Sequence, residues 1–218
     1  RVPLHCATHQ PATSTEVIQI LMESYPEALR MRDKGDGDAL PIHLLAWGGH
    51  ALRSGMKQSF QVLYEAYPES IHEVDGDGDT PLMGMVKYGR ASLDMIQYAL
   101  KVMLLEGNDE ILNMVDKKGN SILHVAVNSF NAEMKEDMLN LIMDTITSIK
   151  GSTKLKPLLQ QTNDLGRTPL HTALEHGYTS SRSLVKTILK GYTDATKIRD
   201  KVGYLPLHLA CQFGVVDV

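Results

Sequence analysis

The sequence lacks long apolar runs and the motifs of common enzymes. No stretch reaches the roughly 18 apolar residues that a membrane-spanning helix needs, so no membrane span is expected. None of Gly-x-Ser-x-Gly, Gly-x-x-x-x-Gly-Lys, His-Glu-x-x-His or Gly-x-Gly-x-x-Gly occurs. These motifs carry nucleophilic, phosphate-binding, zinc and dinucleotide chemistry. We therefore expect a protein that is not an enzyme and needs no cofactor.

The chain also lacks the positive charge that nucleic-acid binding favours. Its 22 Lys and Arg residues are outnumbered by 26 Asp and Glu residues, which gives a net charge of −4. Nucleic-acid-binding domains usually present a basic face, so no nucleic-acid partner is expected. With 43% hydrophobic and 22% charged residues, the composition is that of a folded globular chain.

What the chain has in abundance is a recurring four-residue motif. It is close to Thr-Pro-Leu-His and begins at Val2, Leu40, Thr80, Ser121, Thr168 and Leu205. From the second copy on, an Asp or Asn precedes each motif. The distances from one such Asp or Asn to the next are 42, 41, 47 and 37 residues. A period of this length is the signature of a repeat protein, which offers an extended surface rather than one catalytic pocket.

Each repeat begins with turn chemistry and continues as a pair of helices. Asp or Asn beside Gly, as in 75–79, favours a tight turn. Thr80 and Thr168 are then expected to be N-caps, with Pro81 and Pro169 in the first helical position. Apolar residues at helical spacing predict a second helix in each repeat. We expect first helices to begin near residues 4, 41, 81, 122, 169 and 206.

This repeat resembles the ankyrin repeat, whose signature is Thr-Pro-Leu-His-x-Ala. Residues 168–173 match that signature completely, whereas Met83-Gly84-Met85 replaces His-x-Ala in the third repeat. The resemblance implies an all-α fold, an ankyrin-type α-solenoid of helix-turn-helix repeats with β-hairpin or turn fingers. It predicts one array over 1–218, with units near 1–32 (partial), 33–74, 75–115, 116–162, 163–199 and 200–218 (partial). The extra length is assigned to segments between or after helices: 51–57, 99–108 and 150–156.

The ends of the chain and its two cysteines bear on where the protein works. Residues 1–3 fall inside a repeat, and residues 213–218 stop where a second helix is expected, so we expect a piece of a longer array. Cys6 and Cys211 belong to the first and last units, where stacking would keep them apart. Unpaired cysteines are typical of reducing compartments, which predicts an intracellular protein, cytoplasmic or nuclear.

Two features suggest a metal, and neither meets the requirements of a site. Counted from Asp75, an EF-hand loop would need Gly at position 80 and Glu at position 86, and the chain has Thr80 and Val86 there. Five of the nine His residues occupy the same place in successive repeats. That spacing is too wide for a shared ion, so we expect no metal and interpret these His side chains as bonding their own turns.

The resemblance also implies where a partner would bind. In ankyrin-like units, the two residues before the Gly that ends the first helix point to the concave face. Carried over by register, the candidate binding residues are Trp47, Lys87, Tyr88, Asn128, Glu175, His176, Gln212 and Phe213. Aromatic residues are favoured at interface hot spots, so Trp47 and Tyr88 are the expected anchors. The alternative interpretation is that Trp47 covers a neighbouring repeat.

These observations predict a protein–protein interaction scaffold or adaptor that binds another protein on its concave face. Turn tips such as Lys117 and Lys118 would form the polar rim of that surface. A second interpretation is the recognition module of a larger enzyme, a kinase or ubiquitin ligase, whose catalytic domain lies outside this sequence. A third is a purely structural spacer.

Overall fold

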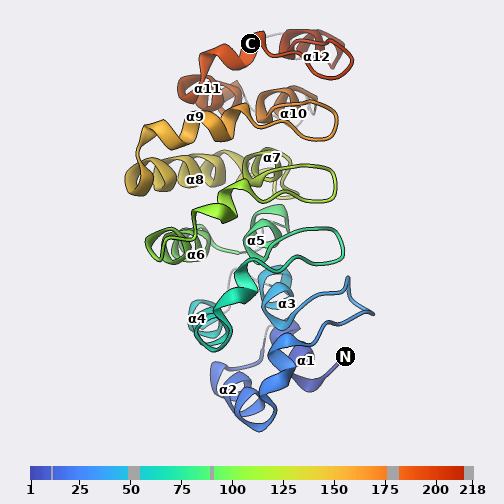
Figure 1. The fold of residues 1–218 in the computed structure, drawn as a ribbon, viewed down its shortest axis with the longest axis vertical. Coiled ribbons are helices and arrows are strands. Elements are labelled where there is room, and N and C mark those ends of the chain that lie inside the picture. The colour runs from blue at the N-terminus through green and yellow to red at the C-terminus, as the bar shows by residue number, and fades with distance from the viewer. Residues whose placement is uncertain (11, 49–54, 89–90, 176–181, 214–218) are drawn as a thin grey trace. The chain divides into compact units, whose positions relative to one another are not determined.

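The fold is all-α and follows the predicted repeat. The structure is a computed structural model, and it describes residues 1–218 except 11, 49–54, 89–90, 176–181 and 214–218. Among the described residues there is no β-strand, only two isolated antiparallel bridges, Asp33 with Ala39 and Val115 with Ser121. Helices alternate with extended turns along the chain (Figure 1). By contacts the chain divides into two compact units, 1–99 and 100–218.

The first unit is built from paired helices. Its helices are α1 (Pro3–His9), α2 (Thr15–Ser24), α3 (Pro41–Gly48), α4 (Met56–Ala66), α5 (Pro81–Tyr88) and the beginning of α6 (Leu93–Leu105), with 3-10 turns η1 (Pro26–Arg30) and η2 (Pro68–Ile71). The first helices stack on one another, α1 on α3 and α3 on α5, and α2 packs on α4. Phe60, Leu63 and Met85 are among the fully buried side chains that join the helices.

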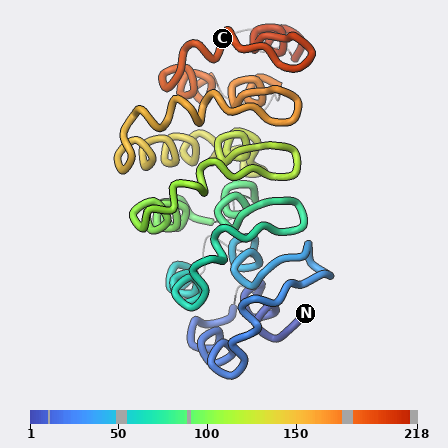
Figure 2. The backbone as a smooth tube through the Cα atoms, in the orientation of Figure 1, coloured from blue at the N-terminus to red at the C-terminus, as the bar shows by residue number. Residues whose placement is uncertain are grey.

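The second unit repeats the pattern with one additional helix. It contains η3 (Asp109–Asn113), α7 (Ile122–Val127), α8 (Lys135–Lys150), α9 (Ser152–Gln160), α10 (Pro169–Glu175), α11 (Arg182–Gly191), η4 (Thr193–Lys197) and α12 (Pro206–Gln212). Here α7 stacks on α10 and α10 on α12, while α8 packs against α9 and α11. The tube in Figure 2 shows each first helix after α1 following an extended loop. We call these loops fingers: residues 33–39, 75–79, 116–120, 163–167 and 200–204.

All six first helices begin within one residue of the predicted positions. The physical reason is the expected one at several starts, where Pro occupies the first helical position and needs no backbone donor. The repeated His adds a link that the sequence did not predict. The Nδ1 atom of His43 accepts the Leu40 amide at 3.3 Å, and its Nε2 lies 3.0 Å from the Glu73 carbonyl oxygen. Because Nδ1 accepts, Nε2 carries the proton and donates it to that carbonyl.

This bridge recurs at three other repeats. The Nε2 atoms of His5, His124 and His171 lie 2.9, 2.8 and 3.2 Å from the carbonyl oxygens of Met31, Arg167 and Tyr204. Each ring therefore joins the start of its own helix to the segment that leads into the following first helix. Burial lowers the pKa of His43 and of His124 to about 4, which keeps both rings neutral at pH 7.

The predicted extra segments are more helical than expected. The segment 150–156 was assigned to extra length after a helix, and most of it lies in α9. Burial of Leu155, Leu158 and Leu159 stabilises α9, although Pro157 lies inside it and cannot donate a backbone hydrogen bond. Likewise α6 continues to Leu105, through most of 99–108. Residues 56–57 of the expected insertion 51–57 begin α4, and 51–54 lie outside the described residues.

Candidate partner-binding site

In the first unit, the predicted anchor Trp47 packs into the next repeat. A Cβ atom placed on Gly84 would lie only 2.8 Å from Cδ1 and Nε1 of the indole, so the ring lies directly on the Gly84 backbone. A Cβ on Gly37 would lie 3.0 Å from Cη2 at the other end of the ring. The Tyr88 ring meets the indole edge-on at a centroid distance of 5.9 Å. Trp47 is therefore half-buried, with its Nε1 lacking a hydrogen-bond partner among the described residues.

Lys87, the second predicted residue of this unit, is held by carboxylates of its own finger. Its Nζ bonds Asp79, whose side chain is fully buried, and lies 3.4 Å from Asp77. Burial opposes the charge on Lys87, but the hydrogen bond and the negative charge of Asp79 raise its pKa above the usual value. Burial also raises the pKa of Tyr88. The predicted residues of the first unit are thus brought together as a packed cluster.

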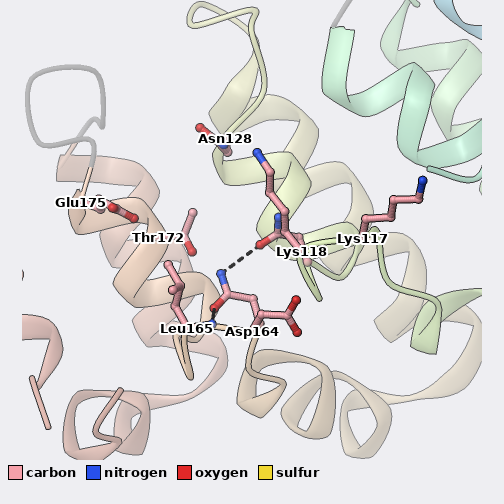
Figure 3. A pocket seen from close by; sticks show the side chains of 9 residues that line it. Lys117, Lys118, Asn128, Asp164, Leu165, Thr172 and Glu175 are labelled. Atoms are coloured by element: carbon pink, nitrogen blue, oxygen red, sulfur yellow. Dashed lines mark hydrogen bonds between the residues drawn. The ribbon is translucent and has the colours of Figure 1, made fainter. Parts of the chain in front are cut away.

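In the second unit, Asn128 and Glu175 are brought together at a pocket. The pocket has a volume of about 330 Å³. Its lining residues are Lys117, Lys118, Asn120, Asn128, Asn163, Asp164, Leu165, Thr172 and Glu175. Figure 3 shows that they come from two first helices and the two fingers that precede them. Asn128 is the C-cap residue of α7, and Glu175 is the last residue of α10. The two predicted rim lysines, Lys117 and Lys118, also line this pocket.

Hydrogen bonds between the two fingers hold the floor of the pocket. The Asn163 amide Nδ2 donates to Asn120 Oδ1 at 3.0 Å, the contact dashed in Figure 3. The backbone N–H of Asp164 donates to the Lys118 carbonyl at 2.9 Å. Asn163 Oδ1 accepts the amides of Leu165 and Arg167 within its own finger, at 3.0 and 3.1 Å. The amide groups of the floor are therefore already used, which fixes the shape of the pocket before any partner arrives.

The wall formed by Glu175 carries a charge that is already compensated. The Arg167 guanidinium lies 2.5 Å from Glu175 Oε1, and its Nε lies 3.4 Å from Asp200 Oδ2. Asp200 also accepts the backbone amides of Val202 and Tyr204, at 3.0 and 2.8 Å. Although burial raises the pKa of Asp200, these hydrogen bonds outweigh it and lower the pKa below the usual value. The Glu175 carboxylate is thus part of a structural network.

Thr172 is the residue of the pocket that stands out. Its side chain is 6% exposed, and its Oγ1 has no hydrogen-bond partner among the residues that the structure describes. Asn128 is exposed, as are Lys117 and Lys118, and their side chains form no hydrogen bond or ion pair within the described part of the chain. A buried hydroxyl without a partner costs free energy, so the Thr172 side chain lowers the stability of the free chain.

The remaining predicted residues do not join this pocket. Gln212 is exposed at the end of α12, and Phe213 follows it, half-buried. His176 lies outside the described residues. Five lining residues were not predicted from the sequence: Thr172, Asn120, Asn163, Asp164 and Leu165. The sequence nevertheless marks position 172 as variable. The residue after the repeated His or its substitute differs among the six repeats: it is Cys, Leu, Gly, Val, Thr and Leu in chain order.

Two further properties of the described residues concern other functional classes. In the described ranges, no three His, Cys, Asp or Glu side chains come close enough together to hold a metal ion. No helix in the described part of the chain combines the length and the apolar character that crossing a bilayer requires.

Comparisons with known proteins agree with the fold. No family model matches the chain. It is 29% identical over 112 residues to the nuclear factor NF-kappa-B p105 subunit of Rattus norvegicus, which is 51% of this chain and 10% of that protein. It is 30% identical over 137 residues to alpha-latrotoxin-Lhe1a of Latrodectus hesperus, which is 57% of this chain and 8% of the toxin. The chain thus spans about a tenth or less of these relatives.

Solved structures match nearly the whole chain. A crystal structure of an ankyrin repeat protein superposes with a TM-score of 0.69 at 19% identity, covering 97% of this chain and 91% of that one. A chain from the structure of a predatory endopeptidase of Bdellovibrio bacteriovorus in complex with an immunity protein, a complex of two proteins, superposes with a TM-score of 0.67 at 17% identity, covering 99% of this chain and 93% of that one. The predicted ankyrin-type fold is confirmed.

Proposed function

The chain has the ankyrin-repeat fold, and we propose that it is a protein-interaction module that binds another protein through its first-helix ends and fingers. The module carries no chemistry of its own and presents a surface fixed in advance. The main support is the pocket of the second unit, because Thr172, Asn128 and Lys118, whose side chains have no partner among the described residues, border it above a hydrogen-bonded floor. A fixed surface loses little conformational entropy when a partner binds.

We place the module inside the cell, in the cytoplasm or the nucleus. Cys6 and Cys211 are both free and exposed, which suits a reducing compartment. As an adaptor the module would act by itself. Alternatively it is the recognition part of a larger protein such as a kinase or ubiquitin ligase, and the far greater length of its two curated relatives makes this second proposal worth testing. The full gene sequence separates the two.

Site-specific photo-crosslinking tests the proposed surface. A benzophenone amino acid replaces Lys117 on a finger or Gln212 at the end of a first helix, and the chain is irradiated in lysate of its source cells. The matched controls replace Lys101 on α6 and Asp144 on α8, which are equally exposed on second helices. We expect a discrete protein adduct from the first pair only. Adducts from the controls alone, or from none of the four positions, would contradict the proposal.

A further inference from the structure

The pocket of the second unit occupies the place that Trp47 fills in the first unit. Trp47 is four residues after His43, and it packs on Gly84, which directly follows Met83 in the next repeat. By the same register, Asn128 is four residues after His124. These equivalent positions form a filled contact in one unit and the border of a pocket in the other.

Thr172 completes the equivalence. It directly follows His171, as Gly84 directly follows Met83, and it borders the pocket together with Asn128. An indole over glycine closes the first site, whereas the shorter Asn128 beside Thr172 leaves about 330 Å³ open. The second unit therefore has space, at a register position known to accept a large side chain, that a group from outside could fill.

The chemistry of the open site favours a group that accepts hydrogen bonds. Thr172 Oγ1 is buried and has no partner within the described ranges, so its O–H is available as a donor. The exposed Asn128 amide is a second donor. In Figure 3 the Lys118 side chain runs toward Asn128, which brings an ammonium group to the same side of the pocket. Three donors of this kind suit a carboxylate.

The carboxylates that line the pocket do not oppose this choice. Glu175 is bound by the Arg167 guanidinium at 2.5 Å. The Asp164 carboxylate points away from Thr172 in Figure 3. Lys118 lies on the adjoining finger and forms no ion pair within the described part of the chain, so positive charge borders the opening, whereas the Lys117 side chain runs away from Asn128 and Thr172 in Figure 3.

We propose that this pocket receives the carboxylate of a Glu or Asp side chain from the bound protein, held by Thr172 Oγ1, Asn128 and Lys118. Leu165, which is 55% exposed, supplies an apolar wall for the methylene groups of that side chain. This inference rests on the proposed function, and it adds the chemical class of the group that is recognised. A Lys or Arg side chain would meet the ammonium group of Lys118, and a Gln side chain would forgo the charge-assisted bonds.

Pooled peptides test the choice of group. The probes are acetylated, amidated and fluorescently labelled eleven-residue pools in which the central residue is Glu, Gln or Lys and all other positions are random uncharged residues. We expect the Glu pool to bind about tenfold more tightly than the Gln pool by fluorescence anisotropy, the scale of hydrogen bonds to a charged group. The Lys pool should bind least. Equal binding of the Glu and Gln pools, or preference for the Lys pool, overturns the proposal.

Variants locate the binding in this pocket. The double variant N128W/T172G copies the Trp47–Gly84 contact and should reduce Glu-pool binding to the level of the Gln pool. Thr172→Val removes only the hydroxyl and should weaken Glu-pool binding about threefold to tenfold. Asp144→Trp adds an exposed indole on α8 as the matched control and should change nothing.

The variants also separate this inference from the proposed function. Glu-pool binding that survives in both pocket variants means that the carboxylate binds elsewhere, and it overturns the assignment even where photo-crosslinking at position 117 succeeds. If no discrete adduct forms at position 117 or 212 while wild type still binds the Glu pool tenfold more tightly than the Gln pool and N128W/T172G does not, the pocket chemistry stands and the protein-partner proposal fails.

Discussion

The contact between Trp47 and Gly84 makes a sharp prediction for the substitution Gly84→Ala. Gly84 lies in α5, where replacing Gly by Ala would ordinarily stabilise the helix by about 1 kcal/mol. Here the new Cβ would lie 2.8 Å from Cδ1 and Nε1 of the indole, so the ring must move. It cannot move freely, because Gly37 and Tyr88 contact its other sides.

The two effects have opposite signs, and the steric one is the larger. Forcing a methyl group into a packed site typically costs about 1–3 kcal/mol. After the gain in helix propensity of about 1 kcal/mol is subtracted, we expect Gly84→Ala to lower the free energy of unfolding by about 1 kcal/mol. In a Trp47→Ala background the clash is gone, and the same substitution should stabilise by about 0.5–1 kcal/mol.

A double-mutant cycle measures this coupling. Urea unfolding of wild type, both single variants and the double variant is followed by far-UV circular dichroism, since the fluorescence of the only Trp is lost in two of the four proteins. We expect a coupling energy of about 2 kcal/mol, within the range for residues in contact. In Gly84→Ala the Trp47 emission should also shift to the red. Stabilisation by Gly84→Ala in the wild-type background would refute the packing described for Trp47.

Three further predictions follow from buried polar groups. His43 and His124 have pKa values of about 4, below their unfolded value of about 6.5, so the unfolded chain binds more protons between these pH values. Above pH 6.5 the two neutral rings should make their full contribution to the free energy of unfolding. As the pH is lowered toward 4, that free energy should fall by up to roughly 3 kcal/mol per ring, which urea midpoints measured across this range would reveal. Midpoints that stay unchanged from pH 6.5 to 5 would contradict this prediction. Thr172→Val removes a buried hydroxyl without a partner in the described residues and should raise the free energy of unfolding by about 1 kcal/mol, so a lower melting temperature would count against the assigned environment. Arg167→Met leaves the Asp200 carboxylate, which is 1% exposed, without its ion pair. It should lower the free energy of unfolding measured in urea by about 2–3 kcal/mol. An unchanged midpoint would show that the backbone amides alone satisfy the Asp200 carboxylate.

The starts of the repeats could be predicted because local chemistry determines them. A tight turn, an N-cap residue and Pro in the first helical position act over a few residues. Most starts carry two or three of these signals, and all six first helices begin within one residue of the predicted positions. The ends of the repeats lack such signals. In α9, Leu155 and Leu158 are buried by other helices, and this tertiary packing overrides the helix-breaking tendency of Pro157.

The repeat register could predict which positions are equivalent, but not whether each position is filled by a side chain or left open. Register identified Trp47 and Asn128 as equivalent, and both lie at the ends of first helices. Whether such a position is filled depends on the residue it meets in the following repeat, which is Gly84 in one case and Thr172 in the other. That pairing spans 37 residues in the first unit and 44 in the second, so no local pattern reveals it. The role of Trp47 and Tyr88 as partner anchors stays a prediction.

The paired positions suggest how a repeat array acquires a binding pocket without altering its framework. The His bridges and the hydrogen bonds between fingers are made by residues other than the pair, as the contacts of His43 and His124 show. Exchanging the pair therefore changes the surface while the stacking of helices is maintained. A large side chain over glycine gives a closed contact, whereas the small polar residue beside Thr172 leaves a buried donor without a partner in the described part of the chain. If the proposed carboxylate enters, the stability lost at that hydroxyl is recovered, so the same atom would weaken the free chain and select the bound group.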